Sequence, residues 1–271
     1  MSAPAATFIV RAKDKHDTIE ATLQSIRAQS VASELIVVDS GSTDGTRELA
    51  AAYADRVIDI PPAAFSYGGA LNAGAAAASA PVHAALSAHC TLPDGDWLER
   101  VLRHYRDPAI AATNGERLDP EGRRLEAPLV QTLELAHRHP GWGFSNHAST
   151  WRAEVWDAHP FDERLVACED KEWALRVLAD GRRIVYDPAL FVGGAHRKAA
   201  GLREYFRRVR RESAAYATFA QVPELSAFDA VRRWWRIPPG GHPLRSRLSV
   251  MRTAEIAGVY AGRRAGRRSR S

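Results

Sequence analysis

The chain has 271 residues, of which 45% are hydrophobic, which excludes a mainly disordered protein and allows one large core or two small ones. Its two cysteines, Cys90 and Cys168, allow at most one disulfide, and neither belongs to a Cys-x-x-Cys pair, so we expect free thiols. The net charge of +5 is uneven, because residues 231–271 hold eleven arginines and one glutamate. A basic tail on a mildly acidic body predicts contact with an anionic partner.

Neither a secretory signal nor a membrane span is predicted. The first eight residues lack a charged leader followed by a long apolar run. No stretch approaches the roughly eighteen apolar residues of a membrane-spanning helix. We therefore expect a cytoplasmic protein, either soluble or peripheral at the inner face of the plasma membrane.

The first half of the chain alternates predicted strands and helices. Short apolar runs indicate strands, and apolar residues at helical spacing indicate helices. Asp17 and Glu20 resemble a capping box that would start the first helix. In chain order we expect strand 6–12, helix 18–28, strand 35–38, helix 46–53, strand 57–60, helix 72–79, strand 82–86, helix 97–105 and strand 109–113. This alternation predicts βαβ units and a mostly parallel sheet.

The second half is less regular. It contains a glycine- and aromatic-rich loop at 141–146, a predicted helix over 170–178 and a predicted edge strand over 183–186. A long amphipathic helix is predicted over 202–220, after which prolines and glycines interrupt the pattern.

A candidate ligand site lies in residues 37–46, VVDSGSTDGT. Asp39 ends a buried strand and precedes a glycine-rich turn and a helix start, which is where open α/β sheets bind ligands. Helix amides there favour phosphates, and the carboxylate could accept a hydrogen bond from a uracil or thymine ring. Equally, Thr43 and Asp44 could cap a helix while Asp39 orders the turn. The segment alone leaves both interpretations open.

Together with other segments, it resembles the family 2 glycosyltransferases, which have the GT-A fold. The matching segments follow in order: RAKD (11–14), VVDSGSTDGT (37–46), FSYGGALNAG (65–74), GWGFSN (141–146) and CEDKEW (168–173). FSYGGALN and EDKEWALR are most similar to rhamnosyltransferase-like bacterial members. The resemblance covers roughly residues 6–212, and it implies an α/β, Rossmann-like catalytic domain over 1–222 with a basic helical extension over 223–271.

The resemblance also implies roles for single residues. Asp39 would contact the nucleotide base beside Arg11 and Asp14. Asp170 would be the general base of an inverting displacement, taking the proton of an acceptor hydroxyl, while Glu169 would bind or orient the acceptor. Acidic residues in the first turn of a helix also suit its dipole, so both could be structural. Further donor-binding residues would be Ser42, Asn72, Ser87 and Gly143.

One segment departs from the family pattern. An Asp-x-Asp motif usually ends the fourth strand and holds a divalent metal, but this strand ends in Ser87, Ala88 and His89. Mg²⁺ and Mn²⁺ prefer oxygen ligands, so the loss of two carboxylates weakens such a site. His89 and the late histidine His196 could still bind a metal, or Lys and Arg could neutralise the leaving group. Dependence on a divalent cation is left open.

The resemblance implies a nucleoside-diphosphate sugar donor of the UDP, dTDP or GDP type and a glycan, lipid-linked or small-molecule acceptor. A sugar nucleotidyltransferase would need a GxGTR-type loop after the first strand, and a dehydrogenase would need GxGxxG; neither is present. A non-catalytic nucleotide-sugar-binding module remains an alternative. The tail, in which arginines flank Trp234 and Trp235, suits an anionic membrane surface; nucleic acid or a merely solvated or packed tail are the other interpretations.

Overall fold

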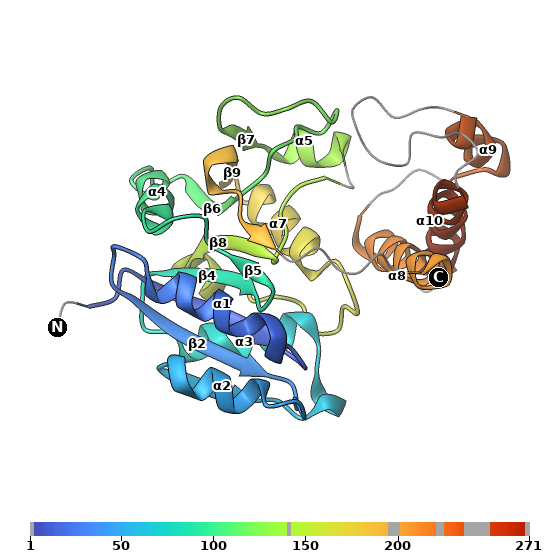
Figure 1. Cartoon of the computed structure of the whole chain (residues 1–271). Helices are drawn as coiled ribbons and strands as arrows, with labels where there is room; N and C mark the ends of the chain where they lie inside the picture. Colours follow the sequence, from blue (N-terminus) through green and yellow to red (C-terminus); the bar gives the residue numbers. More distant parts are fainter. Residues whose placement is uncertain (1–2, 140–141, 195–200, 221–224, 236–249, 269–271) are drawn as a thin grey trace.

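The computed structural model describes residues 3–139, 142–194, 201–220, 225–235 and 250–268 (Figure 1). The helices are α1 His16–Arg27, α2 Thr46–Tyr53, α3 Tyr67–Ala77, α4 Trp97–His104, α5 Leu133–Arg138, α6 Ala153–Ala158, α7 Glu169–Ala179, α8 Leu202–Phe219, α9 Ala227–Trp235 and α10 Val250–Arg268. The strands are β1 Ala6–Ala12, β2 Ser33–Asp39, β3 Arg56–Asp59, β4 Val82–Ser87, β5 Cys90–Thr91, β6 Ile110–Asn114, β7 Leu129–Gln131, β8 Ala148–Arg152, β9 Arg183–Tyr186 and β10 Gly193–Gly194.

The main sheet has the order β3-β2-β1-β4-β8-β6-β9-β7, and β5 pairs separately with β10. β1 is parallel to β2 and β4, whereas β8 runs antiparallel between β4 and β6. β9 is parallel to β6 and is covered by the antiparallel β7, so the prediction that 183–186 forms an edge strand is wrong. Because most strands are parallel, their carboxyl ends meet at one edge.

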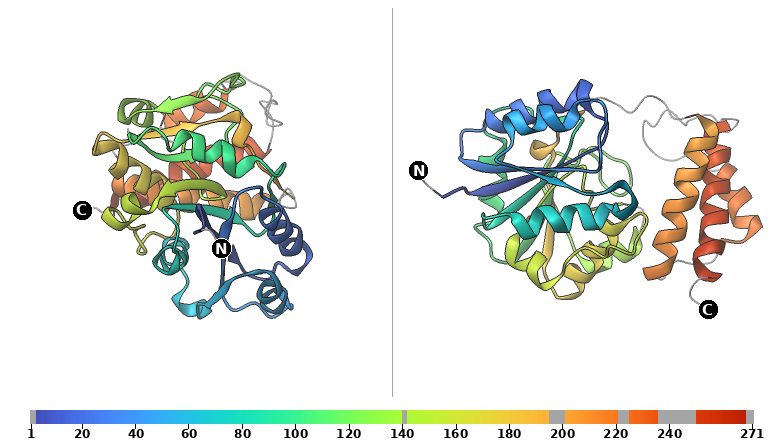
Figure 2. Two further views of the ribbon diagram at one scale, coloured as in Figure 1. Left: turned by 90° about the vertical axis from the view of Figure 1, so that its left-hand side faces the viewer. Right: turned by 90° about the horizontal axis from the view of Figure 1, so that it is seen from below.

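Alternate side chains of the strands face two separate cores. Phe8 and Val10 point into a core shared with α1, α2 and α4, whereas Ile9 points into a core shared with α3, α5, α6 and α7. The sheet is therefore covered on both faces, and the three layers are visible from below in Figure 2. This double covering explains the continuous apolar runs of β1 and β2.

α1 begins earlier than the sequence predicts, and its cap is different. The helix starts at His16 with Lys15 as N-cap, so Asp17 is not the capping residue. Two amides at this end instead donate to side chains of the turn after β2: Lys15 N to Thr46 Oγ1 at 2.7 Å and His16 N to Asp44 Oδ2 at 3.1 Å. The Thr46 hydroxyl, followed by backbone amides, lowers the pKa of Asp44 to about 2. The start of α1 is thus fixed by the β2 turn.

The last helices lie beside the sheet and pack on one another (Figures 1 and 2). Gly258, Gly262 and Gly266 of α10 face α8 at four-residue spacing, and a Cβ on Gly262 would lie 2.4 Å from the Arg210 carbonyl oxygen. α8 in turn contacts α7, since the Cys168 thiol donates to the Glu212 carbonyl at 3.5 Å. The expected boundary near Val222 lies outside the described residues.

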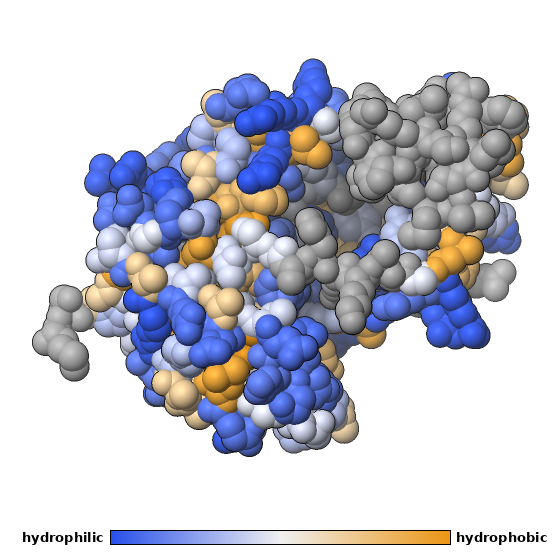
Figure 3. Space-filling model, in the orientation of Figure 1, coloured by the Kyte–Doolittle hydropathy of each residue, from blue (hydrophilic) through white to orange (hydrophobic). Residues whose placement is uncertain are grey.

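Two further expectations can be compared with the described part of the chain. Cys90 and Cys168 are both free, as predicted. Among the helices that the structure describes, none is long and apolar enough to cross a membrane. On the face shown in Figure 3, the described surface is mainly hydrophilic with small apolar patches.

Candidate active site

The turn after β2 is ordered by Asp39, which is almost fully buried. Its Oδ2 accepts hydrogen bonds from the amides of Gly41 at 2.9 Å and Ser42 at 2.8 Å, and its Oδ1 accepts one from the Ser42 hydroxyl at 2.5 Å. Gly41 has φ +81°, and a Cβ there would lie 2.7 Å from the Pro62 side chain, so glycine is required. Asp39 therefore shapes this turn, and from the described residues its Oδ1 accepts one hydrogen bond, where a carboxylate oxygen can accept about two.

The loop after β1 lies on this turn. Asp14, with a positive φ of 47°, donates its amide to Ser42 Oγ and accepts the Thr43 amide at Oδ1, each at 2.9 Å. Lys13 Nζ donates to the Gly41 carbonyl at 2.7 Å. The fold thus brings together Asp14, Asp39 and Ser42, three of the predicted donor residues, with Lys13 as a cation beside them.

Arg11 joins this edge of the sheet to α3 and α7. Its guanidinium donates to the carbonyls of Tyr67 at 3.3 Å and Asn146 at 3.1 Å, and lies 3.6 Å from Glu169 Oε1. Arg11 and Ser87 are direct partners in the β1–β4 register. Arg11 therefore lies between the expected donor side and the acidic residues of α7.

The acidic pair is at the start of α7, after the left-handed residue Cys168. Asn146 contacts both members: its amide donates to Asp170 Oδ2 and its side chain to Glu169 Oε1, each at 3.4 Å. Glu169 is only 6% exposed, whereas Asp170 is half-buried. Burial, and then the charge of Asp170, raises the pKa of Glu169, while Arg11 acts in the opposite direction. The two neighbours thus differ in access to solvent and in charge environment.

Lys171, which the sequence analysis did not single out, holds the glycine loop. Its Nζ donates to the carbonyls of Gly143 at 2.5 Å and Phe144 at 2.7 Å. Gly143 has φ +118°, and a Cβ there would lie 2.8 Å from Gln131 and 3.0 Å from the Tyr186 hydroxyl. Burial lowers the pKa of Lys171, and Asp170 opposes that effect. Lys171 thus fastens the loop to the helix that carries the acidic pair.

Asn114 is a second residue that the sequence analysis missed. It ends β6, donates to the carbonyls of Ser145 and Ala148 through Nδ2, and accepts the Ser145 amide at 3.2 Å. It thereby fixes the loop that carries Asn146. A polar residue at the end of a predicted strand, the feature that identified Asp39, was the available signal for it.

Asn72 lies in α3 and binds the segment after α6. Its Nδ2 donates to the Phe161 carbonyl at 2.9 Å and to Glu163 Oε1 at 2.8 Å. Its Oδ1 accepts Trp156 Nε1 at 2.9 Å and the Phe161 amide at 3.0 Å. All four hydrogen-bonding positions of the amide are therefore used within the protein. Asn72 thus holds this segment, and its contact with a donor stays a prediction.

The expected metal ligands are only partly described. Ser87 and His89 are half-buried at the end of β4, where the His89 amide donates to the Ser87 carbonyl at 2.7 Å. His196 and Gly141 lie outside the described residues. No group of three or more His, Cys, Asp or Glu side chains arranged for a metal occurs within the described residues. A hydroxyl and an imidazole without a carboxylate are a weak donor set for Mg²⁺ or Mn²⁺.

Several known proteins of similar sequence are named as glycosyltransferases. Residues 7–159 match the model of glycosyl transferase family 2. The chain is 27% identical over 179 residues to the O-antigen chain rhamnosyltransferase WbaN of Salmonella anatum, covering 60% of this chain and 57% of that protein. It is 26% identical over 203 residues to RfbN, an O-antigen chain rhamnosyltransferase of Salmonella typhimurium, covering 69% and 64%. The chain thus spans less than two thirds of the length of either relative.

Solved structures of similar fold include a mannosyltransferase from Pyrobaculum calidifontis in complex with GDP-Man and Mn²⁺, with a TM-score of 0.64, 18% identity, and coverage of 94% of this chain and 70% of that chain. Glucosyl-3-phosphoglycerate synthase from Mycobacterium tuberculosis, solved with Mn²⁺, UDP-Glc and phosphoglyceric acid, has a TM-score of 0.60, 21% identity and coverage of 81% of both chains. These similarities confirm the GT-A fold. Because the family model matches more than half of the chain, the protein belongs to glycosyl transferase family 2.

Proposed function

We propose that the protein is an inverting glycosyltransferase that moves a hexose or deoxyhexose from a nucleoside-diphosphate sugar to an acceptor hydroxyl, with Asp170 as the general base. The observation that carries this proposal is the meeting of the β2 turn, Arg11 and the acidic pair at one edge of the sheet. The names of the similar proteins point to nucleotide sugars as donors.

The nucleotide binds at the turn after β2. Asp39 holds the amides of Gly41 and Ser42 in place, and its Oδ1 has one acceptor position left for an N–H of the base. Arg11 and Lys13 provide positive charge for the diphosphate, which gains negative charge as the sugar leaves. Lys13 is half-exposed and therefore accessible to a bound donor.

The displacement requires a base on the acceptor side. As the acceptor oxygen attacks the anomeric carbon, its proton passes to Asp170, and the bond to the diphosphate oxygen breaks with its electron pair going to the diphosphate. Attack opposite the leaving group inverts the anomeric centre. Asp170 suits the role better than Glu169 because it is more accessible, whereas Glu169 is buried against Arg11 and Asn146.

A divalent cation, where present, would stabilise the charge of the leaving diphosphate. Ser87 and His89 fill the positions of the two aspartates of the usual Asp-x-Asp motif, and without a carboxylate they fit such an ion poorly. We expect activity to respond less steeply to EDTA than in an enzyme with two aspartate ligands. If EDTA abolished the activity, Mn²⁺ restored it and the His89→Ala variant had no activity, a histidine would have taken over binding of the metal.

The function is tested by two measurements on the whole chain. Thermal unfolding in the presence of UDP, dTDP and GDP identifies the nucleotide that stabilises the protein. NMR of the product formed from the matching sugar nucleotide then shows whether the sugar is transferred to an acceptor or slowly released by hydrolysis. The same spectra give the configuration of the anomeric centre. We expect stabilisation by one nucleotide and an inverted product. Stabilisation without any turnover would favour a non-catalytic binding module, and a retained configuration would contradict the role of Asp170.

A further inference from the structure

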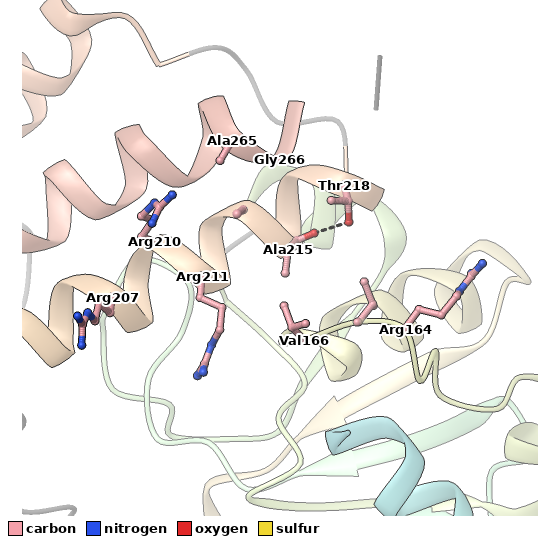
Figure 4. A pocket seen from close by; sticks show the side chains of 11 residues that line it. Arg164, Val166, Arg207, Arg210, Arg211, Ala215, Thr218, Ala265 and Gly266 are labelled. Carbon is pink, nitrogen blue, oxygen red and sulfur yellow. Dashed lines mark hydrogen bonds between the residues drawn. The ribbon is translucent and has the colours of Figure 1, made fainter. Parts of the chain in front are cut away.

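A cavity of about 430 Å³ lies between the segment 164–166 and the helices α8 and α10 (Figure 4). Arg207, Arg210 and Arg211 of α8 contribute to its wall. Leu165 and Val166 line the opposite side, and Val166 is 64% exposed. The cavity thus combines cationic and apolar groups.

The α8 arginines are not matched by acidic side chains. Among the described residues, no carboxylate lies within 4.0 Å of the guanidinium groups of Arg207, Arg210 and Arg211, whereas Arg164, at the rim, is paired with Asp162 at 2.9 Å. Like charges at three- and four-residue spacing on a helix repel one another. A bound anion would relieve this repulsion.

Close packing of two helices forms the floor. A Cβ on Gly266 would lie 2.2 Å from the Ala214 carbonyl oxygen, so α10 approaches the backbone of α8 directly. Figure 4 shows Arg211 extending from α8 on the side where Val166 lies. A guanidinium beside an exposed apolar side chain suits an organic phosphate, because one group binds the phosphate oxygens and the other the substituent.

The cavity is close to the acidic pair. The Cys168 thiol bonds to the carbonyl of Glu212, which joins α8 to the residue before Glu169. Asp170 follows Val166 by four residues, and consecutive Cα atoms are about 3.8 Å apart, so their Cα atoms lie within roughly 15 Å. A phosphorylated molecule of modest size can therefore occupy the cavity and present a hydroxyl to Asp170.

We propose that this cavity binds the phosphate or diphosphate group of a phosphorylated acceptor, with an apolar substituent of that acceptor against Leu165 and Val166. That the bound molecule is an acceptor rests on the proposed function. The anion site itself rests on the cavity and its arginines. The donor diphosphate is a separate group, held at the β2 turn.

Calorimetry on the full chain tests the site with two probes, inorganic pyrophosphate and geranyl diphosphate. The double variant Arg207→Gln/Arg211→Gln should bind both probes at least about tenfold more weakly than wild type, because each lost arginine removes a charge-assisted hydrogen bond. Arg203→Gln is the matched control, since Arg203 is exposed on α8 but does not line the cavity. Geranyl diphosphate should bind more tightly than pyrophosphate, because only it contacts the apolar side.

Equal binding by the double variant and Arg203→Gln, or no binding by wild type, would overturn the proposal. The proposal would also fail if the double variant no longer bound phosphatidylglycerol vesicles but kept its affinity for geranyl diphosphate. In that case the arginines would bind a membrane surface. Affinity for the stabilising nucleoside diphosphate, measured in the same preparations, should be unchanged. If the protein binds the donor and turns it over but does not bind the probes, only this inference is refuted. If it binds the probes but shows no turnover, only the proposed function is refuted.

Discussion

Glu169 and Asp170 are adjacent single residues placed in different surroundings. Glu169 is buried between Arg11 and Asn146, and its pKa is raised by burial and by its neighbour. Asp170 is half-buried and accepts the Lys171 amide at 2.8 Å through Oδ1. A base must reach its substrate, so we expect the more accessible carboxylate to receive the proton and the buried one to contribute to acceptor binding.

Asp170→Asn should reduce turnover by about 10²–10⁴-fold, the usual contribution of a general base, with little change in donor affinity. Asparagine keeps the size and most hydrogen bonds but is not basic. The measurement is steady-state transfer with saturating donor. Glu169→Gln should cost less or act mainly on acceptor affinity.

Glu172→Gln is a matched control, because Glu172 is also in the first turn of α7 but pairs with Arg176. It tests whether loss of a charge near the helix start is enough to lower turnover. If Asp170→Asn keeps near-normal turnover while Glu169→Gln is inactive, the base has been assigned to the wrong neighbour. Normal turnover in both would reject the mechanism.

Asp39→Ala should weaken binding of the preferred nucleoside diphosphate by about tenfold or more, since a charged hydrogen bond contributes about 1.5–3 kcal/mol. Calorimetry gives this directly. Asp55→Ala is the control, because Asp55 accepts the Leu35 amide near the opposite end of β2 and pairs with Arg27. Equal affinities in wild type and both variants would remove Asp39 from the nucleotide site.

The sequence indicated the acidic pair and the β2 turn as candidate site segments, because each is a short local segment next to a strand or helix end. It could not predict the roles of Asn146 and Lys171, because their partners are distant in sequence: Asn146 bonds to Asp170, and Lys171 to Gly143. The same holds for Asn72, whose amide is used by residues more than eighty positions later. Long-range hydrogen bonds do not leave a periodic pattern.

Among whole elements, the parallel strands and helices of the first half were predicted well, because doubly covered strands are apolar throughout. β8 was missed because two of its four buried residues are polar. Ser149 and Thr150 are 1% and 0% exposed, and Thr150 is bonded to Thr113 and Tyr105 at 2.7 Å each. A buried strand stabilised by hydroxyl pairs lacks the apolar run that predicts strands. Because neither β7 nor β8 was predicted, β9 was expected to lie at the edge of the sheet.

The contact between α8 and α10 depends on glycine. A Cβ on Gly262 would lie 2.4 Å from the Arg210 carbonyl oxygen and 2.7 Å from Ser213 Cβ. Gly262→Ala should therefore push the helices apart and lower the free energy of unfolding by about 1–3 kcal/mol, the usual cost of overpacking. Urea unfolding measures this loss.

Gly201→Ala is the control for that variant, because Gly201 has negative φ and a Cβ there would meet no atom of the described residues within 4 Å. It should lower stability less than Gly262→Ala does, because it causes no clash and only replaces the N-cap glycine of α8 with the poorer capping residue alanine. If Gly262→Ala were as stable as Gly201→Ala, the close packing of α10 on α8 would be refuted.

For the whole molecule, the distribution of charge is the feature that the single site does not explain. Most of the excess arginine follows residue 231, and the described part of α9 carries Phe228, 75% exposed, and Val231, 56% exposed, with Arg232 also exposed. These three residues have the spacing of one helix face. We propose that this face binds an anionic membrane surface, which would keep the enzyme close to lipid-linked acceptors.

Removing the tail after residue 231 would also remove α10 and uncover α8, so point variants test the membrane proposal more sharply. Phe228→Asp/Val231→Asp should reduce partitioning to phosphatidylglycerol vesicles by about tenfold or more per residue, because burying each apolar side chain contributes roughly 1.5–3 kcal/mol. Leu202→Asp is the control, since Leu202 is 46% exposed and begins α8, where an acidic residue suits the helix dipole. Vesicle co-sedimentation at low and high salt gives both partition constants, and the electrostatic share should decrease as salt screens the arginines. Equal sedimentation of wild type and the double variant at low salt would contradict the membrane interpretation. The tail would then be interpreted as solvated or as packed on the protein.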